Sequence, residues 1–196
     1  MVRTTPFRQK ESGWMVYPGY GWRKILFKAP LFFWRLGLAR LSYPPFLLLT
    51  TVGRKSGAPR RTMFEYAYIN GHIYISSGWG ERAQWYKNVL ANPFVTVQTV
   101  REGTVSGKAV LVSDDEEISM LYRHMRGKSP IWTPYLDSWG IKDSLEDFLA
   151  KKDRLYILRV EAIQVETPPP LKTDLVWVWP LIAGIVLILI LLLSQP

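Results

Sequence analysis

The stretch TMFEYAYINGHIYISS, residues 62–77, decides the fold of this chain. Its two halves, residues 62–69 and 72–77, are rich in aromatic and β-branched residues, which favour strands. Asn70-Gly71 joins the halves and is a strong signal for a tight turn between antiparallel strands. The stretch therefore predicts a β-hairpin.

Further strands and a few helices are predicted on both sides of this hairpin. The other predicted strands are residues 46–51, 94–100, 104–112 and 155–165, and the predicted helices are residues 82–91, 114–126 after a Ser113 cap, and 143–150. The middle pair of these strands forms a second hairpin around Glu102-Gly103. Hairpins with few helices between them predict an antiparallel barrel, a mainly β (α+β) fold, rather than a doubly wound sheet.

The composition excludes several kinds of chemistry. The 196 residues include no cysteine, which excludes disulfides, thiol nucleophiles, zinc fingers and iron–sulfur clusters. The two histidines, His72 and His124, are too few for a histidine-based metal site. We therefore expect no metal centre.

Positive charge is concentrated in the N-terminal third. Residues 1–61 contain 12 Lys and Arg against one acid, Glu11, whereas the whole chain has a net charge of +9. The partner of this third is therefore a membrane surface, an anionic small molecule or nucleic acid.

The C-terminal stretch LVWVWPLIAGIVLILILLL, residues 175–193, has no charged residue. As a helix it would extend about 28 Å, close to the hydrocarbon thickness of a bilayer. We therefore predict a transmembrane tail anchor after a short linker, residues 167–174; the alternative is a buried core helix. Lys172 precedes the span and no cation follows it, which places the body of the protein in the cytoplasm.

A second segment with membrane character lies within residues 1–44, the basic N-terminal segment. Residues 22–41 combine apolar side chains with Lys24, Lys28 and Arg35 on one helical face. This pattern predicts a basic amphipathic helix in the membrane interface, kinked or split at Pro30. A helix packed against the domain explains the pattern equally well.

The turn TTVGRKSGAPRRT, residues 50–62, places four cations directly after an apolar strand. Gly53 and Gly57 allow the backbone to turn and expose N–H groups, and Arg54, Lys55 and Arg60 can bind carboxylates or phosphates. It lacks the spacing of a P-loop. The turn therefore predicts an anion site, and the alternative is a solvated hairpin.

The stretch SSGWGERAQWYKNVLANPFVTV, residues 76–97, has the composition of a second binding segment. Its serines and glycines lie between a strand and a helix, where backbone N–H groups bind anions. Its aromatic and amide side chains follow at once and can seat a flat ring. The candidate residues of this segment are Ser76, Ser77, Gly78, Trp79, Trp85, Tyr86 and Asn88.

Together, TTVGRKSGAPR (residues 50–60) and QWYKNVLANPFVTV (residues 84–97) resemble the deazaflavin-dependent nitroreductase and quinone reductase family. The resemblance covers residues 45–166. It implies a split β-barrel, similar to FMN-binding barrels, that binds reduced coenzyme F420 and passes its hydride to a substrate.

The resemblance also implies residue roles. Arg54, Lys55 and Arg60 would bind the anionic phosphate and oligoglutamate tail of the coenzyme. Ser77 and Gly78 would contact the phosphate, and Trp85 and Asn88 would seat the ring. Tyr135 would be the catalytic residue, as a hydrogen-bond donor to the substrate.

The leading hypothesis is a membrane-anchored oxidoreductase that transfers a hydride from reduced F420 to a lipophilic quinone or nitro compound. Its expected partners are membrane lipid, the small-molecule acceptor, and a membrane-complex partner or a second copy of the chain. One alternative is a non-catalytic accessory subunit of a membrane complex, and another is the same barrel binding FMN or haem. Nucleic acid is excluded because the aromatic residues do not interleave with the basic turn.

Overall fold

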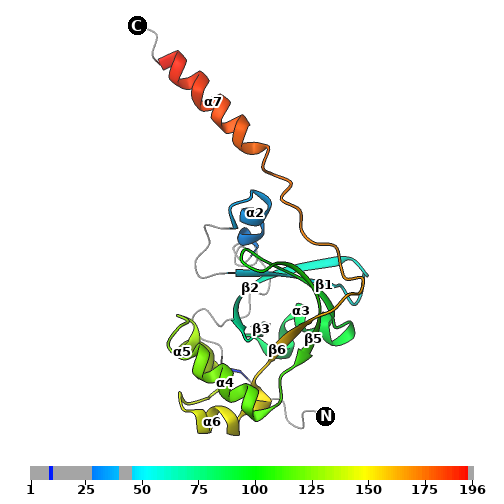
Figure 1. Cartoon of the computed structure of the whole chain (residues 1–196). Helices are drawn as coiled ribbons and strands as arrows, with labels where there is room; N and C mark the ends of the chain where they lie inside the picture. The colour runs from blue at the N-terminus through cyan, green and yellow to red at the C-terminus, as the bar shows by residue number, and fades with distance from the viewer. Residues whose placement is uncertain (1–8, 11–27, 40–45, 194–196) are drawn as a thin grey trace.

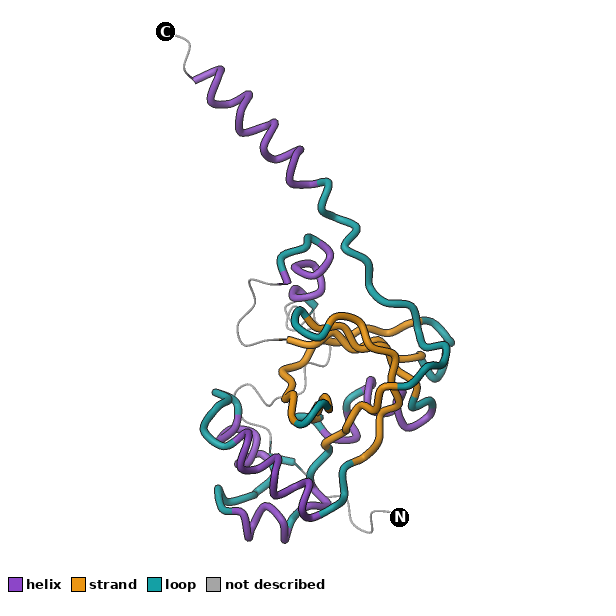
Figure 2. Tube along the Cα trace, viewed as in Figure 1, coloured by secondary structure: helices purple, strands orange, loops and turns teal. Residues whose placement is uncertain are grey.

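Six antiparallel strands form a closed barrel in the computed structural model, which describes residues 9–10, 28–39 and 46–193 (Figure 1). The strands are β1 (Phe46–Val52), β2 (Pro59–Ile69), β3 (His72–Ser76), β4 (Phe94–Thr99), β5 (Gly103–Leu111) and β6 (Ile157–Ala162). Their order around the barrel is β1-β2-β3-β6-β5-β4, and Figure 2 shows the barrel as the strand-rich part of the trace. The predicted α+β fold with an antiparallel barrel is confirmed.

The hairpin formed by β2 and β3 has the predicted turn. Asn70 and Gly71 both have positive φ, 51° and 82°, which suits a two-residue hairpin turn. β2 and β3 pair in register from Ile69 opposite His72 to Tyr66 opposite Ile75. Strand β6 is shorter than predicted, since pairing with β3 and β5 involves only residues 157–162.

Strand β2 begins three residues earlier than predicted. Its pairing with β1 continues to Val52 opposite Pro59, so the basic turn is confined to residues 53–58. Within this turn Gly53 donates its N–H to the Ala58 carbonyl (2.9 Å), and Gly57 donates to the Gly53 carbonyl (2.7 Å). The cations of the turn are thereby held at one end of the barrel.

Four helices pack around the barrel. They are α3 (Gln84–Ala91), α4 (Asp115–Met125), α5 (Trp132–Ser138) and α6 (Leu145–Ala150). Helices α4, α5 and α6 gather at one end of the molecule (Figure 1). The predicted cap of α4 is wrong by one residue, because Asp114 rather than Ser113 accepts the N–H of Glu117 (2.9 Å). Helix α5 was not predicted, since it has only seven residues and includes Pro134.

Helix α2 (Ala29–Arg35) is the described part of the predicted amphipathic helix at residues 22–41. Pro30 lies in its first turn, where no N–H is needed, so the proline begins the helix instead of kinking it. Trp34 is buried, whereas Phe32 and Phe33 are exposed. The other residues of the predicted segment 1–44, apart from 9–10, 28 and 36–39, lie outside the described residues.

The predicted linker, residues 167–174, packs along the barrel for much of its length. Thr96 bonds to Thr167 and to the carbonyl of Pro168. The amide of Gln98 donates to the Leu171 carbonyl (3.0 Å) and accepts the Leu171 N–H (2.7 Å). We call residues 167–171 the strap.

Helix α7 (Val178–Leu193) follows the strap and projects away from the barrel (Figure 1). It begins three residues later than predicted and has 16 residues. Among the helices that the structure describes, none is both long enough and apolar enough to cross a membrane. The predicted transmembrane helix at residues 175–193 is therefore not supported.

Candidate cofactor site

A cavity of about 1510 Å³ lies beside the basic turn and strand β2. Its wall includes most of the residues of β2, the loop after β3, the start of α3 and the segment from α4 to α5. Residues of α2 complete one side. The two segments that the sequence analysis selected therefore meet at one cavity.

Arg54 and Asn88 join these two segments directly. The Oδ1 atom of Asn88 accepts the backbone N–H of Arg54 (3.3 Å) and a guanidinium N–H of the same residue (3.0 Å). Arg54 also donates to the side chain of Gln84 (2.9 Å), and Asn88 donates to Thr51 Oγ1 (3.3 Å). Both residues line the cavity, but much of Arg54 is occupied in holding α3 against the turn.

Lys55 and Arg60 are exposed and line the same cavity. Arg60 donates to Ser56 Oγ (3.2 Å), which keeps its guanidinium beside the turn. The wall contains several further cations, and among the described residues its only acids are Glu65 and Glu102. The other cationic residues of the wall are Lys28, Arg35, Arg54, Arg61, Arg101 and Lys128. This excess of positive charge favours an anionic ligand.

The last residue of β3 contributes one polar group that has no partner among the described residues. Ser76 Oγ is buried, forms no hydrogen bond with any described residue, and belongs to a residue that lines the cavity. Ser77, in contrast, donates to the Gly80 carbonyl (2.9 Å) and is not among the described residues that line the cavity. Gly78 lines the cavity, and its carbonyl accepts the side-chain amide of Gln9 (2.5 Å).

Gly80 fixes the path of this loop. It has a φ of +53°, and a Cβ at this position would lie 2.8 Å from the rings of both Trp139 and Tyr156. A glycine is therefore required here both for its backbone conformation and for the close approach of two aromatic rings. The loop is held in one shape at the edge of the cavity.

Some of the predicted aromatic residues line the cavity, and one packs elsewhere in the core. Trp79 and Trp85 line the cavity, and the Trp85 ring packs edge-on against Phe64 with centroids 4.5 Å apart. Tyr86 packs against Tyr156 instead (5.4 Å) and is not among the described lining residues. Of the predicted ring-seating residues, the structure thus brings Trp79, Trp85 and Asn88 to the cavity.

Tyr135, on α5, also lines the cavity. It is buried, and Trp132 lines the wall beside it and donates to Asp143 (3.3 Å). His124 of α4 also lines the cavity. Burial, followed by the charge of Lys128, lowers the pKa of His124, so its imidazole is largely neutral at pH 7.

Several wall residues were missed by sequence reasoning. Tyr66 donates to Glu102 (2.9 Å), and burial together with this bond raises the pKa of Tyr66 to about 12. Ser129 donates to Glu65 (2.7 Å) and ties the segment between α4 and α5 to β2. The strand pattern of residues 62–69 contained a usable signal, because alternate residues of β2 share a face of the barrel.

These residues fit coenzyme F420. The exposed cations Lys55 and Arg60 suit its anionic groups, and Trp85 presents an apolar wall to a flat ring. Ser76 Oγ, which bonds to no described residue, can bond to a ligand. A closed antiparallel barrel with a cationic and aromatic cavity is suited to bind an anionic cofactor that carries a flat ring.

Comparison with known proteins agrees with this class. The profile of a family described as F420H(2)-dependent quinone reductase matches residues 37–139. A solved structure described as an F420-H2 dependent reductase (FDR-A) is 26% identical, with a TM-score of 0.44, over 60% of this chain and 95% of that one. General stress protein 26 from Bacillus anthracis is 16% identical, with a TM-score of 0.41, over 65% of this chain and 86% of that one.

The family match covers more than half of the chain. The chain belongs to the F420H(2)-dependent quinone reductase family. It is an oxidoreductase, and its cofactor is reduced coenzyme F420.

Proposed function

We propose that this protein reduces a lipophilic quinone with reduced F420 in the cavity beside β2. The observation that carries the proposal is the arrangement of this cavity. The exposed cations Lys55 and Arg60 and the buried Tyr135 line this one cavity. A nitro compound is the second acceptor class that the family resemblance implies.

Within this cavity the protein would bind and orient the coenzyme and the acceptor. When bound, the coenzyme supplies a hydride, which together with one proton converts a quinone to a quinol. Lys55 and Arg60 would hold the anionic part of the coenzyme, and Trp85 and Asn88 would limit the position of its ring. Tyr135 Oη would donate a hydrogen bond to the acceptor oxygen that gains negative charge. The wall from Trp132 to Phe148 would exclude water.

Membrane attachment through residues 175–193, with the barrel in the cytoplasm, stays a prediction and belongs to this proposal. Its support is the uncharged C-terminal stretch, whose described helix α7 is exposed along its whole length. Association with a second copy or with a membrane complex also stays a prediction. An accessory subunit without catalysis is the alternative that the assay below tests.

The first prediction concerns Tyr135. Tyr135→Phe should lower kcat by about 100-fold, because one hydrogen bond to the developing charge is lost, and should leave F420 affinity nearly unchanged. The assay mixes detergent-solubilised protein, reduced F420 and a menaquinone analogue, and follows oxidation of the cofactor by absorbance.

Tyr122→Phe is the matched control. Tyr122 is a buried residue of α4, and the substitution removes its hydroxyl, which donates to Asp143. It should change stability more than kcat. Cofactor binding without oxidation by any quinone or nitro compound would contradict the proposed reaction and favour the accessory role.

A further inference from the structure

Helix α2 and the base of α7 are joined although they lie far apart in the sequence. Arg35 Nε lies 2.7 Å from Asp174 Oδ1, and its Nη2 lies 2.8 Å from Oδ2, which makes a two-point ion pair. Leu175 donates its N–H to the Arg35 carbonyl (3.0 Å), and Trp179 Nε1 donates to the Leu36 carbonyl (2.9 Å). We call these contacts the α2–α7 clamp.

The ion pair within the clamp is stable to ordinary changes of pH. The hydrogen bond to Asp174 raises the pKa of Arg35, and the same bond lowers the pKa of Asp174. Both groups are therefore charged at neutral pH. A two-point pair also restricts rotation about the contact, since a planar guanidinium and a carboxylate must stay in one plane.

The clamp lies beside large apolar side chains that no described residue covers. Phe32 and Phe33 of α2 are 55% and 54% exposed, and Trp177 at the base of α7 is 58% exposed. Figure 1 shows α2 at the end of the barrel from which α7 projects. The two elements therefore present their apolar side chains at the same end of the molecule. A patch of this kind marks an interaction surface.

A lipid bilayer fits this surface better than a protein does. Helix α7 is apolar on every side from Val178 to Leu193, whereas a helix that docks on a protein needs a single apolar stripe. Trp177 directly precedes it and Trp179 lies in its first turn, at the depth where tryptophan occurs in membrane interfaces. Lys28 is exposed at the start of α2, in the strongly basic third of the chain, and suits anionic headgroups.

Helix α2 also forms part of the cavity. Leu31 and Phe32 line it together with Lys28 and Arg35, and Leu171 of the strap lines it as well. The side of the molecule that would face lipid is therefore continuous with the cavity in which the acceptor must bind.

We propose that α2 and the base of α7 form one bilayer-docking surface, held in a single orientation by the α2–α7 clamp, and that the acceptor enters the cavity from the lipid beside α2. The docking surface is inferred from the arrangement and exposure of α2 and the base of α7, independently of the proposed function. The entry route rests on the proposed function.

The experiment uses the full-length protein and vesicles of phosphatidylcholine and phosphatidylglycerol that contain a menaquinone analogue. The chain has no cysteine, so Phe33→Cys can carry a single nitroxide whose depth is measured by electron paramagnetic resonance. We expect the label to lie below the headgroups. Asp174→Ala should move it toward water and lower turnover of the vesicle-bound quinone by about tenfold, because orientation at the bilayer is lost.

Two comparisons make the test specific. Asp174→Ala should leave turnover of a water-soluble quinone unchanged, and Arg35→Asp combined with Asp174→Arg should restore the label depth. Asp115→Ala is the matched control, since it breaks an exposed 2.6 Å ion pair with Lys152 that lies outside the clamp.

A Phe33→Cys label that stays in water in the otherwise unchanged protein overturns the docking surface. A label that lies in lipid, but at the same depth in Asp174→Ala as in the otherwise unchanged protein, overturns the proposed role of the clamp. Spin coupling between labels on two chains would show that a second copy covers the surface, which also overturns the proposal. If neither quinone oxidises the cofactor, the proposed function fails, while the depth measurement still decides the docking surface.

Discussion

At the scale of single residues, neighbouring cations of the basic turn have different structural roles. Arg54 bonds to Asn88 and Gln84 and so connects the turn to α3. Lys55, the next residue, is exposed beside the same cavity. Removing the side chain of Arg54 would take one hydrogen-bond donor from Asn88 Oδ1. This loss lowers stability because Asn88 is buried.

This difference gives a second prediction. Arg54→Ala should lower both F420 affinity and the free energy of unfolding, the latter by about 1 kcal/mol. Lys55→Ala should lower F420 affinity alone, by up to about tenfold for a solvent-exposed contact. Fluorescence titration and thermal unfolding separate the two effects. Lys87→Ala, an exposed cation of α3, is the control; equal affinities for all three variants would remove the anion-binding role.

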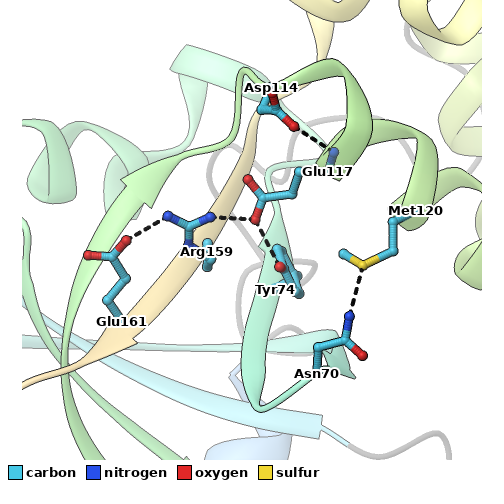
Figure 3. Close-up of polar contacts among 7 residues, drawn as sticks. All are labelled: Asn70, Tyr74, Asp114, Glu117, Met120, Arg159 and Glu161. Carbon is cyan, nitrogen blue, oxygen red and sulfur yellow. Dashed lines mark hydrogen bonds and ion pairs between the residues drawn. The ribbon is translucent and has the colours of Figure 1, made fainter.

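At the scale of elements, a polar network attaches α4 to the barrel (Figure 3). Glu117 of α4 accepts from Tyr74 of β3 (2.8 Å) and from Arg159 of β6 (2.6 Å). Arg159 also bonds to Glu161 (2.6 Å), and this bond, ahead of the one to Glu117, raises the pKa of Arg159. The network holds the helix that carries His124 at the cavity wall.

The third prediction concerns the pH dependence of this network. Burial, followed by the hydrogen bond to Glu117, raises the pKa of Tyr74 from 10.0 to about 12. A folded-state pKa that is raised stabilises the protein fully below the unfolded value, and the stabilisation is lost as pH rises from 10 toward 12. Tyr74→Phe should therefore cost about 1 kcal/mol of stability at neutral pH and flatten the loss of stability in that alkaline range.

Alkaline unfolding experiments, with the ultraviolet absorbance of tyrosinate as a second readout, check this prediction. Tyr66→Phe is the comparison, because the pKa of Tyr66 is also about 12 but its partner is Glu102. An unchanged tyrosinate titration in Tyr74→Phe would contradict the role assigned to the Tyr74–Glu117 bond.

At the scale of the whole molecule, the strap fastens the C-terminal end of the chain to the barrel. Thr96 and Gln98 are buried polar residues of β4, and their side chains bond to residues of the strap. Arg61 of β2 also donates to the Pro169 carbonyl (3.4 Å). The barrel and α7 are therefore connected through an ordered segment and then through the α2–α7 clamp.

A pair of truncations tests this arrangement. Ending the chain after Thr173 keeps the strap and should leave the free energy of unfolding of the barrel nearly unchanged. Ending it after Val165 leaves Thr96 and Gln98 without partners and should lower that free energy by about 2–4 kcal/mol, at about 1 kcal/mol for each lost bond plus the newly exposed surface. Denaturant unfolding measures both; equal stabilities would show that the strap contributes nothing.

The sequence by itself determined what local patterns control. The aromatic and β-branched segments joined by Asn70-Gly71 predicted the first hairpin, and the two hairpins together predicted the barrel. The basic turn and the segment around Asn88 were both identified, because each motif is contiguous in the chain. The functional class followed from the pair of motifs, and the family match confirmed it.

The tertiary structure decided what depends on contacts between distant residues. Ser77 and Tyr86 belong to the predicted binding segment, yet both bond or pack elsewhere, because barrel closure determines which face of a loop or helix meets the cavity. Sequence periodicity covers a few turns or strands, whereas Arg35 and Asp174 are 139 residues apart and meet only after the chain has crossed the whole barrel. Such pairings carry no local signal, so the clamp and the strap could be found only in the folded protein.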